Sequence, residues 1–365
     1  EDVKQLFVTS PGGAVRLSGE HDNVAGFTLS PDGSQVIYNT RTENLENSLW
    51  LVNLSERERT KLLDCVHALC SRPVFSPDGN EIVYEYLNYP DGRNILVSPR
   101  WMNLRTGENK PLFKTMNFPG SAPRWSPDGA WLSYSAAGGL RLYNTQTGEN
   151  RLVRSLYSYG AEWSPGGAAI LYLDAVIKDD GQVVAQALVY SLASGAARNI
   201  SPDTDHEILF AAWSPDGKSI AFASYRDGNK DIFLLPLDSS EGEDDLANLT
   251  NTPDREEDNP AWSPDGTQLA YTSGRPGDQL IYVNTFDLKY KNLQEAEVGL
   301  FGQGSEPTWS PDGKAIVFTY HRGDSDVLIG ANLGGWGVAQ EAFGGREYIA
   351  HPTWSEQAIP QDTIQ

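Results

Sequence analysis

Cysteine and histidine are scarce in this chain of 365 residues, which contains two cysteines and five histidines. The histidines lie in five separate segments, and no Walker loop, zinc-ligand spacing or complete EF-hand loop occurs. The Gly-x-Ser-x-Gly motif that an α/β-hydrolase would need is also missing. We therefore predict that the protein is not an enzyme.

Long apolar runs and an excess of positive charge are also absent. No run of eighteen apolar residues occurs and no basic segment leads into an apolar one near residue 1, so we expect no transmembrane segment and no retained signal peptide. Lys and Arg number 28 against 49 Asp and Glu, which gives a formal net charge of −21. Because such a surface repels phosphates, we exclude nucleic acid as a partner.

The sequence does contain a repeated tetrapeptide, Ser-Pro-(Asp/Gly)-Gly. Its copies begin 38 to 50 residues apart, a period that matches one four-stranded blade of a β-propeller. Ser, Pro and Gly in this order suit a type I turn, so each copy is predicted to join two antiparallel strands. The copies begin at Ser30, Ser76, Ser126, Ser164, Ser214, Ser263 and Ser310, with a degenerate eighth copy at Ser355.

Apolar residues around each tetrapeptide follow the period of a β-strand. Trp precedes the Ser in six copies, an aliphatic residue stands six positions after it in every full copy, and an aromatic residue stands two positions later. An offset of two places side chains on one face of a strand. Third strands are predicted at residues 47–54, 231–237 and 279–284, and fourth strands at residues 59–63, 198–201 and 248–250.

The two ends of the chain indicate how the predicted propeller closes. Residues 3–10 and 14–18 are predicted as a third and a fourth strand without the first two, and residues 348–355 as a first strand. Seven whole repeats and one blade shared between the termini give an all-β, eight-bladed propeller, a single domain over residues 1–365. Pro360 weakens the second strand of the shared blade, so seven blades remain the alternative.

Four features of the repeats are shared with a known family. They are the Trp-Ser-Pro-Asp-Gly runs, the aliphatic-x-aromatic strand after each run, the stretch Ser-x-Arg-Asp-Gly-x-x-Asp-Ile-Phe at residues 224–233, and Asn-Leu-Thr at residues 248–250. With these features, essentially the whole chain resembles the TolB-type β-propellers. The resemblance implies the fold but no single function, because propellers host unrelated activities on one scaffold.

The two cysteines, Cys65 and Cys70, lie five positions apart in the segment that leads into the second blade. We predict a disulfide between them, because two cysteines are too few for a structural zinc site; reduced thiols or a bound metal are the alternatives. A disulfide is typical of an oxidising compartment. We therefore expect an extracytoplasmic protein, either periplasmic, secreted or at the cell surface.

Two acidic segments are candidate metal sites, because oxygen-rich loops could hold calcium. Both lead into the first strands of adjacent predicted blades, so we expect them on the same face; solvated surface is the alternative. Apart from calcium, no cofactor is predicted. The candidate ligands are Asp203, Asp205 and His206 before the fifth blade, and Asp254 and Asp258 before the sixth.

The residues just before each first-strand Trp are expected to line the mouth of the central channel. Polar groups of both signs among them make a candidate site for a small ligand or a peptide tail. A channel lined by residues that only need hydration is the alternative. The candidate binding residues are Arg72, Phe210, Asn259, Glu306 and His351.

Two functions remain open from the sequence. The repeat explains nearly every distinctive residue, which favours a non-catalytic, monomeric binding or scaffolding protein that recognises a protein, peptide or glycan at one face. The alternative is a metal-assisted lyase or hydrolase that acts on a polysaccharide at the central channel. That enzyme would need several His and carboxylate ligands to converge there.

Overall fold

All regular elements that the structure describes are β-strands. Among the described residues, no helix is long and apolar enough to cross a membrane. The structure, a computed structural model, describes residues 7–10, 13–19, 22–40, 47–88, 96–113, 120–156, 159–178, 180–201, 206–237, 246–275, 278–287, 292–294, 304–310, 312–322, 325–332 and 340–344.

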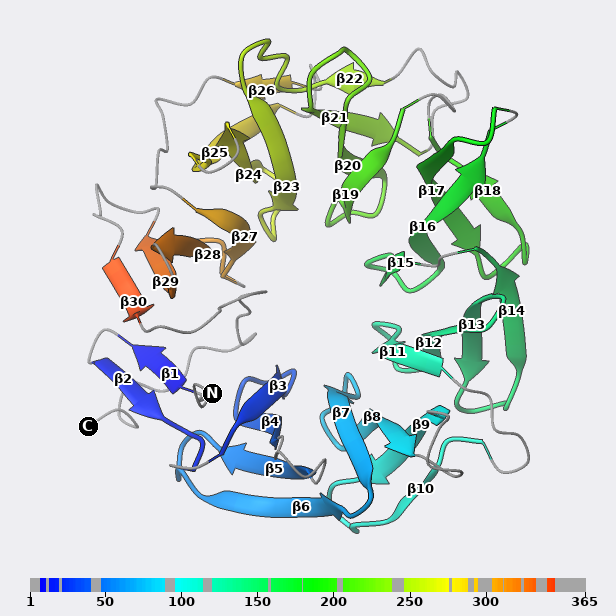
Figure 1. The fold of residues 1–365 in the computed structure, drawn as a ribbon, viewed down its shortest axis with the longest axis vertical. Helices are drawn as coiled ribbons and strands as arrows, with labels where there is room; N and C mark the ends of the chain where they lie inside the picture. The colour runs from blue at the N-terminus through cyan, green and yellow to red at the C-terminus, as the bar shows by residue number, and fades with distance from the viewer. Residues whose placement is uncertain are drawn as a thin grey trace. The chain divides into compact units, whose positions relative to one another are not determined.

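The strands form antiparallel sheets of four, in which neighbours along the chain are also hydrogen-bonded neighbours (Figure 1). Seven such sheets and one two-stranded sheet lie within the described residues. This four-strand meander is the blade that the repeat predicts, so the all-β fold is confirmed. The chain divides into two compact units, one made of Glu1–Trp163 and Ser355–Gln365 and the other of Ser164–Trp354.

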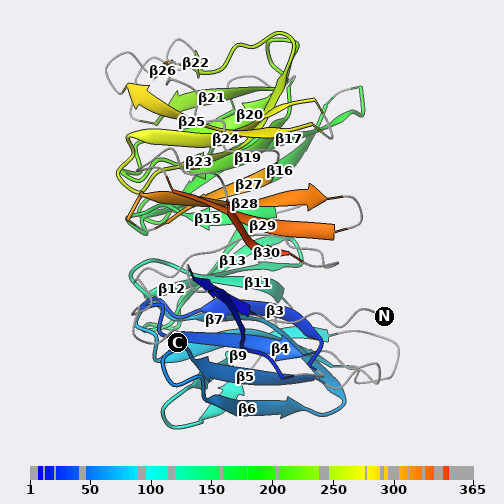
Figure 2. The same cartoon turned by 90° about the vertical axis from the view of Figure 1, so that its left-hand side faces the viewer.

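The first unit begins with a two-stranded sheet of β1 (Phe7–Ser10) and β2 (Gly13–Arg16), close to the strands predicted there. The predicted first strand at residues 348–355 lies outside the described residues. Figure 2 shows β4, β5 and β6 side by side in blue. The other strands of this unit are β3 (Val24–Leu29), β4 (Gln35–Thr40), β5 (Asn47–Asn53), β6 (Arg59–Cys65), β7 (Ala68–Phe75), β8 (Glu81–Asn88), β9 (Leu96–Asn103), β10 (Asn109–Pro111), β11 (Gly120–Trp125), β12 (Trp131–Ala136), β13 (Gly139–Asn144), β14 (Asn150–Arg154) and β15 (Tyr159–Trp163).

The second unit repeats the same pattern, and its third and fourth strands begin within two residues of the predicted positions. Its strands are β16 (Ala169–Ile177), β17 (Val183–Ser191), β18 (Ala197–Asn199), β19 (Ile208–Trp213), β20 (Ser219–Ser224), β21 (Asp231–Pro236), β22 (Ala247–Asn248), β23 (Glu256–Trp262), β24 (Gln268–Gly274), β25 (Leu280–Asp287), β26 (Asn292–Gln294), β27 (Ser305–Trp309), β28 (Ala315–Arg322), β29 (Ser325–Asn332) and β30 (Gln340–Gly344).

The tetrapeptides form tight turns between the first and second strands. In the first copy, the Gly33 N–H donates to the Ser30 carbonyl at 2.9 Å, and Ser30 Oγ donates to Asp32 Oδ1 at 2.6 Å. The Ser30 hydroxyl beside Asp32 lowers the pKa of that carboxyl. The predicted turn is therefore confirmed. The same two bonds recur in the copies at Ser76, Ser126, Ser214, Ser263 and Ser310.

Successive turns also contact one another within each unit. The backbone at Gly79 has a φ of 72°, and a Cβ there would lie 3.8 Å from Cδ of Pro31 in the preceding turn. The proline of one turn thus packs against the glycine of the next. The same contact occurs between Gly129 and Pro77, Gly217 and Pro165, Gly266 and Pro215, and Gly313 and Pro264.

The hydrophobic core lies between neighbouring sheets. The aliphatic and aromatic residues predicted on one face of the second strand are buried in all seven full repeats. Leu171 on β16 packs in one cluster with Phe222 on β20, and Val83 on β8 packs with Leu132 on β12. Trp309 Nε1 also donates to the Ala261 carbonyl at 2.9 Å, across to the preceding first strand. Both faces of the second strands are therefore covered, as their apolar runs predict.

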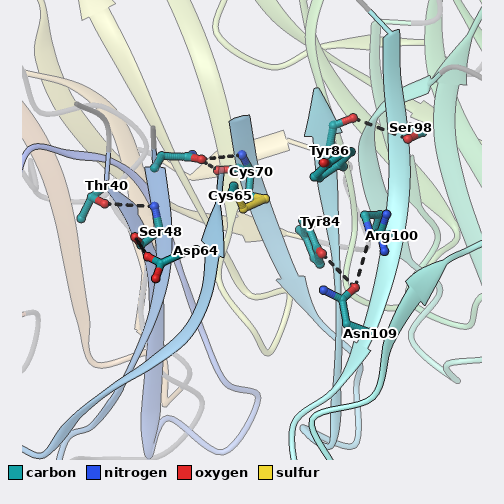
Figure 3. Close-up of a disulfide and its surroundings, with 11 residues drawn as sticks. Thr40, Ser48, Asp64, Cys65, Cys70, Tyr84, Tyr86, Ser98, Arg100 and Asn109 are labelled. Carbon is teal, nitrogen blue, oxygen red and sulfur yellow. Dashed lines mark hydrogen bonds between the residues drawn. A yellow bond between two sulfur atoms is a disulfide. The ribbon is translucent and has the colours of Figure 1, made fainter. Parts of the chain in front are cut away.

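Cys65 and Cys70 form a disulfide that joins β6 to β7 of the next sheet (Figure 3). Their Cα atoms are 6.1 Å apart, and both side chains are buried. The Asn47 side chain accepts a hydrogen bond from the Cys70 N–H at 2.8 Å and donates one to the Cys70 carbonyl. Closing a loop this short stabilises the fold by about 2 kcal/mol on the chain-entropy account.

Candidate functional site

Five first strands contain a β-bulge that begins three residues before the Trp or Phe at their end. In four of them the first bulge residue has a left-handed backbone, and we call these four the bulge residues. Asn tolerates this conformation, but Arg, Ala and Phe adopt it at a cost. The bulge residues are Arg72 (φ 46°), Ala122 (53°), Phe210 (45°) and Asn259 (51°).

A buried carboxylate holds the bulges of the first unit. Glu85 on β8 is buried, and its Oε1 accepts the Ala122 N–H from the next sheet at 2.7 Å. Its Oε2 accepts a hydrogen bond from Ser71 Oγ at 2.9 Å, and Arg72 Nη1 lies 3.4 Å from Oε1. A bulge removes backbone groups from the strand ladder. Glu85 satisfies one of these groups with a charge-assisted bond, which stabilises the unusual backbone.

In the second unit, Asp258 has the corresponding role at Asn259. Asp258 Oδ1 accepts the Asn259 N–H at 2.9 Å. Lys230, immediately before β21 of the preceding sheet, places its Nζ 2.6 Å from Asp258 Oδ2 and 3.6 Å from Glu256 Oε2. Burial alone would lower the pKa of Lys230, but the bond and charge of Asp258 outweigh it and the pKa is raised. The bulge therefore depends on a buried ion pair between two sheets.

Two further carboxyl groups, Glu257 on β23 and Asp231 on β21, are buried beside this ion pair. Thr252 bonds to both, since its N–H donates to Asp231 Oδ1 at 3.2 Å and its Oγ1 donates to Glu257 Oε1 at 2.7 Å. Burial raises the pKa of Glu257 to about 7; the Ser273 and Thr252 hydroxyls oppose this shift, and Asp231 adds to it. Because burial disfavours its charged form, Glu257 still holds a proton in part of the molecules near neutral pH.

The structure describes four of the five predicted binding residues, and all four lie in bulges of first strands. Arg72, Phe210 and Asn259 are all bulge residues. Glu306 lies in the bulge of β27, between Ser305 and Thr308, and His351 lies outside the described residues. Phe210 is 52% exposed, so its ring does not contribute to the core.

The metal candidates are also dispersed. Asp203 and Asp205 lie outside the described residues, and the His206 carbonyl accepts a hydrogen bond from Gln186. Asp254 is exposed, whereas Asp258 is paired with Lys230. In the part of the chain that the structure describes, no three His, Cys, Asp or Glu side chains are grouped to hold a metal.

Sequence analysis missed the buried charges that support the bulges. Glu85 follows directly after the aliphatic-x-aromatic positions Ile82 and Tyr84 and interrupts the apolar run from Ile82 to Leu87. Lys230 and Asp231 come directly before the apolar run Ile232–Leu235 of the third strand. A charge that adjoins a fully buried strand was the available signal, because such a charge needs a partner.

One family matches by sequence, and it is described as "TolB beta propeller domain". Its matches cover residues 157–295 and 195–359, which together make up more than half of the chain. Among curated proteins, no sequence matches.

Several solved structures are similar in fold. Oligogalacturonate lyase from Vibrio parahaemolyticus is 13% identical, with 90% of this chain and 97% of that chain covered and a TM-score of 0.59. Dipeptidyl peptidase 4 from Porphyromonas gingivalis is 13% identical, with 88% and 53% covered and a TM-score of 0.64. TolB from Acinetobacter baumannii is 15% identical, with 79% and 74% covered and a TM-score of 0.44. At these identities the likeness concerns the fold alone.

Proposed function

Because this chain belongs to the TolB beta propeller domain family, we propose that it is a non-catalytic binding protein that recognises a protein, peptide or glycan through its bulge residues. Glu306 and His351 are the further members of the proposed site. Propellers that share one fold serve many different functions. The proposal therefore depends on the bulge residues rather than on the family.

The exposed, left-handed Phe210 is the observation that carries this proposal. A bulky side chain in this backbone region costs of the order of 1–3 kcal/mol, and such residues persist where function requires them. Packing does not explain Phe210, since its ring is about half exposed. Exposed aromatic and arginine side chains are also the residues that most often dominate binding energy. Phe210 and Arg72 therefore fit recognition better than structural roles.

Replacing Phe210 by asparagine should separate binding from stability. Asparagine already occupies the equivalent bulge position at Asn259, so F210N should keep or raise stability by up to about 1 kcal/mol. Ligands selected from a displayed random peptide library and from a glycan array should lose roughly 30-fold or more in affinity, as for a hot-spot residue. Titration calorimetry and urea denaturation measure the two effects.

The matched control is Phe27→Asn, because Phe27 is 43% exposed on β3 without a left-handed backbone. It should leave the affinity for the same ligands unchanged. A second test variant, Arg72→Gln, removes the positive charge beside Glu85. If both F210N and R72Q bound every selected ligand like the wild type, the bulge residues would not be the recognition site.

The proposed binding protein is a monomeric, eight-bladed propeller with one blade shared between its termini. The separate sheet of β1 and β2 and the tetrapeptide copy at Ser355 support this closure. Deletion of residues 1–18 should then lower the melting temperature by several degrees, since it opens a sheet edge. An unchanged melting temperature in calorimetry would contradict closure by these strands.

The Cys65–Cys70 disulfide supports an extracytoplasmic location. Protein taken from its source and unfolded without reductant should contain no free thiol. The enzyme alternative, metal-assisted attack on a polysaccharide, has no supporting ligand cluster among the described residues, and Asp203, Asp205 and His351 lie outside them.

A further inference from the structure

A cleft of about 230 Å³ lies at one end of the sheet that contains β23, β24 and β25. One wall is the loop that precedes β23, and the other is formed by residues 273–275 of β24 and its end and by residues 278–282 at the start of β25. These two segments lie at the same end of the sheet because Glu256 at the start of β23 pairs with Gly274 at the end of β24. The lining side chains that matter here are Asp254, Arg255, Arg275, Asp278, Leu280 and Tyr282.

Tyr282 and Arg255 form a fixed donor group in this cleft. Arg255 Nη1 donates to Tyr282 Oη at 2.9 Å. The Tyr282 ring stacks on the buried Tyr271, with ring centroids 5.9 Å apart and planes at 14°. Since Tyr282 Oη accepts from Arg255, its own O–H is available to donate to a ligand. The remaining N–H groups of Arg255 are available in the same way.

The two arginines of the cleft, Arg255 and Arg275, lie beside two aspartates. Within the described residues, neither Arg255 nor Arg275 forms an ion pair, although Asp254 and Asp278 line the same cleft. The chain carries 49 acidic and only 28 basic residues. Among the described residues, the two guanidinium groups of this small cleft thus remain open to an anionic ligand.

We propose that this cleft binds the C-terminal carboxylate of a peptide. Guanidinium groups and a tyrosine O–H are the donors that match a carboxylate, and the planar guanidinium binds it through two parallel bonds. Leu280 and the Tyr282 ring provide an apolar wall for the last side chain. The volume is below the ~300–1,000 Å³ typical of whole drug-sized ligands, so the cleft accommodates a terminal group.

The two aspartates at the cleft decide between anions. Asp254 and Asp278 offset the attraction of the two guanidinium groups, so the second negative charge of a phosphate adds little attraction and costs more desolvation than the single charge of a carboxylate. The cleft should therefore prefer a carboxylate to phosphate. The proposal uses none of the bulge residues, so it does not depend on the proposed function above.

N-acetyl-leucine and N-acetyl-leucine amide are suitable probes, because they differ only in the carboxylate. By NMR titration, the acid should bind wild-type protein roughly 10- to 100-fold more tightly than the amide, the range for hydrogen bonds to charged groups. Arg275→Gln should remove about the same factor for the acid and little for the amide. Arg105→Gln, at an exposed arginine of the first unit, is the matched control and should change neither.

Equal affinity for the acid and the amide would overturn the proposal, as would an unchanged affinity in R275Q. Tighter binding of inorganic phosphate than of N-acetyl-leucine would also overturn it. Arg275 is exposed, so R275Q should have the same melting temperature as the wild type. A loss of affinity in R275Q would then reflect binding and not unfolding. F210N should bind N-acetyl-leucine normally, which separates a failure of this site from a failure at the bulge residues.

Discussion

Replacing Lys230 by methionine should lower the free energy of unfolding by about 3–5 kcal/mol, the usual cost of leaving a buried charge without its partner. Lys230 and Asp258 are both buried, with Nζ and Oδ2 only 2.6 Å apart. Methionine keeps most of the side-chain volume, so packing changes little. The loss would therefore measure the cost of leaving the buried Asp258 charge without its partner. Urea denaturation at neutral pH gives the difference directly.

Lys218→Met is the matched control, because Lys218 is exposed on the Ser214 turn between β19 and β20, in the same sheet as β21. It should change stability by no more than about 0.5 kcal/mol. The double variant Lys230→Met/Asp258→Asn should recover most of the loss, since asparagine can still accept the Asn259 N–H without a buried charge. Equal losses in K230M and K218M would show that the ion pair does not stabilise the fold.

Glu257→Gln should become more stable relative to wild type as the pH rises from 5 to 8. The pKa of Glu257 is raised to about 7 by its burial, against an ordinary value near ~4.3. A raised carboxyl pKa means that the folded state holds a proton that the unfolded chain releases. The stabilisation that this bound proton gives the folded state is complete below about pH 4 and is lost progressively as the pH rises to about 7. Above that pH the stability changes little.

The expected gain of E257Q over wild type approaches about 3 kcal/mol at pH 8, from the size of the shift. Glutamine keeps an oxygen that can accept the hydroxyls of Ser273 and Thr252, and it carries no charge. Urea denaturation at pH 5, 6, 7 and 8 measures the difference between the two proteins. Glu207→Gln, at an exposed glutamate, is the control, and its free energy of unfolding should follow that of the wild type at all four pH values. Parallel curves for E257Q would mean that Glu257 is ionised in the fold.

The opposite pH response is expected from the carboxyls of the turns. The Ser30 hydroxyl lowers the pKa of Asp32, and Ser263 and Ser310 lower the pKa of Asp265 and Asp312. Their stabilisation is present above the ordinary aspartate pKa and is lost as the pH falls through the lowered values. The difference between E257Q and wild type cancels these contributions, because both proteins share them.

The fold could be predicted from the sequence because its signals are local. The turn at Ser30 needs only the residues of one tetrapeptide, and the burial of Ile82 and Tyr84 follows from their spacing on one strand. Such signals recur along the chain with the period of the repeat. The strand bounds shift by a few residues because the hydrogen-bond ladder, rather than the apolar pattern, sets where a strand ends.

The support of the candidate site could not be predicted in the same way. The left-handed backbone at Arg72 and Phe210 is not encoded by glycine, and in the first unit it accompanies a carboxylate that reaches from Glu85 to Ala122 in another sheet. Glu257 and Asp231 are 26 positions apart and become neighbours only when two sheets pack. The sequence placed Arg72, Phe210 and Asn259 at equivalent positions, and the contacts between sheets determine their backbone.

The contact between the proline of one tetrapeptide turn and the glycine of the next bears on how such a chain can evolve. In five pairs of successive turns within the described residues, the proline of one turn lies against the glycine of the next. A duplicated repeat therefore finds matching neighbours on both sides without any compensating substitution. Gene duplication or loss of one whole repeat preserves this junction, whereas a point mutation of its glycine to a larger residue disturbs two repeats at once.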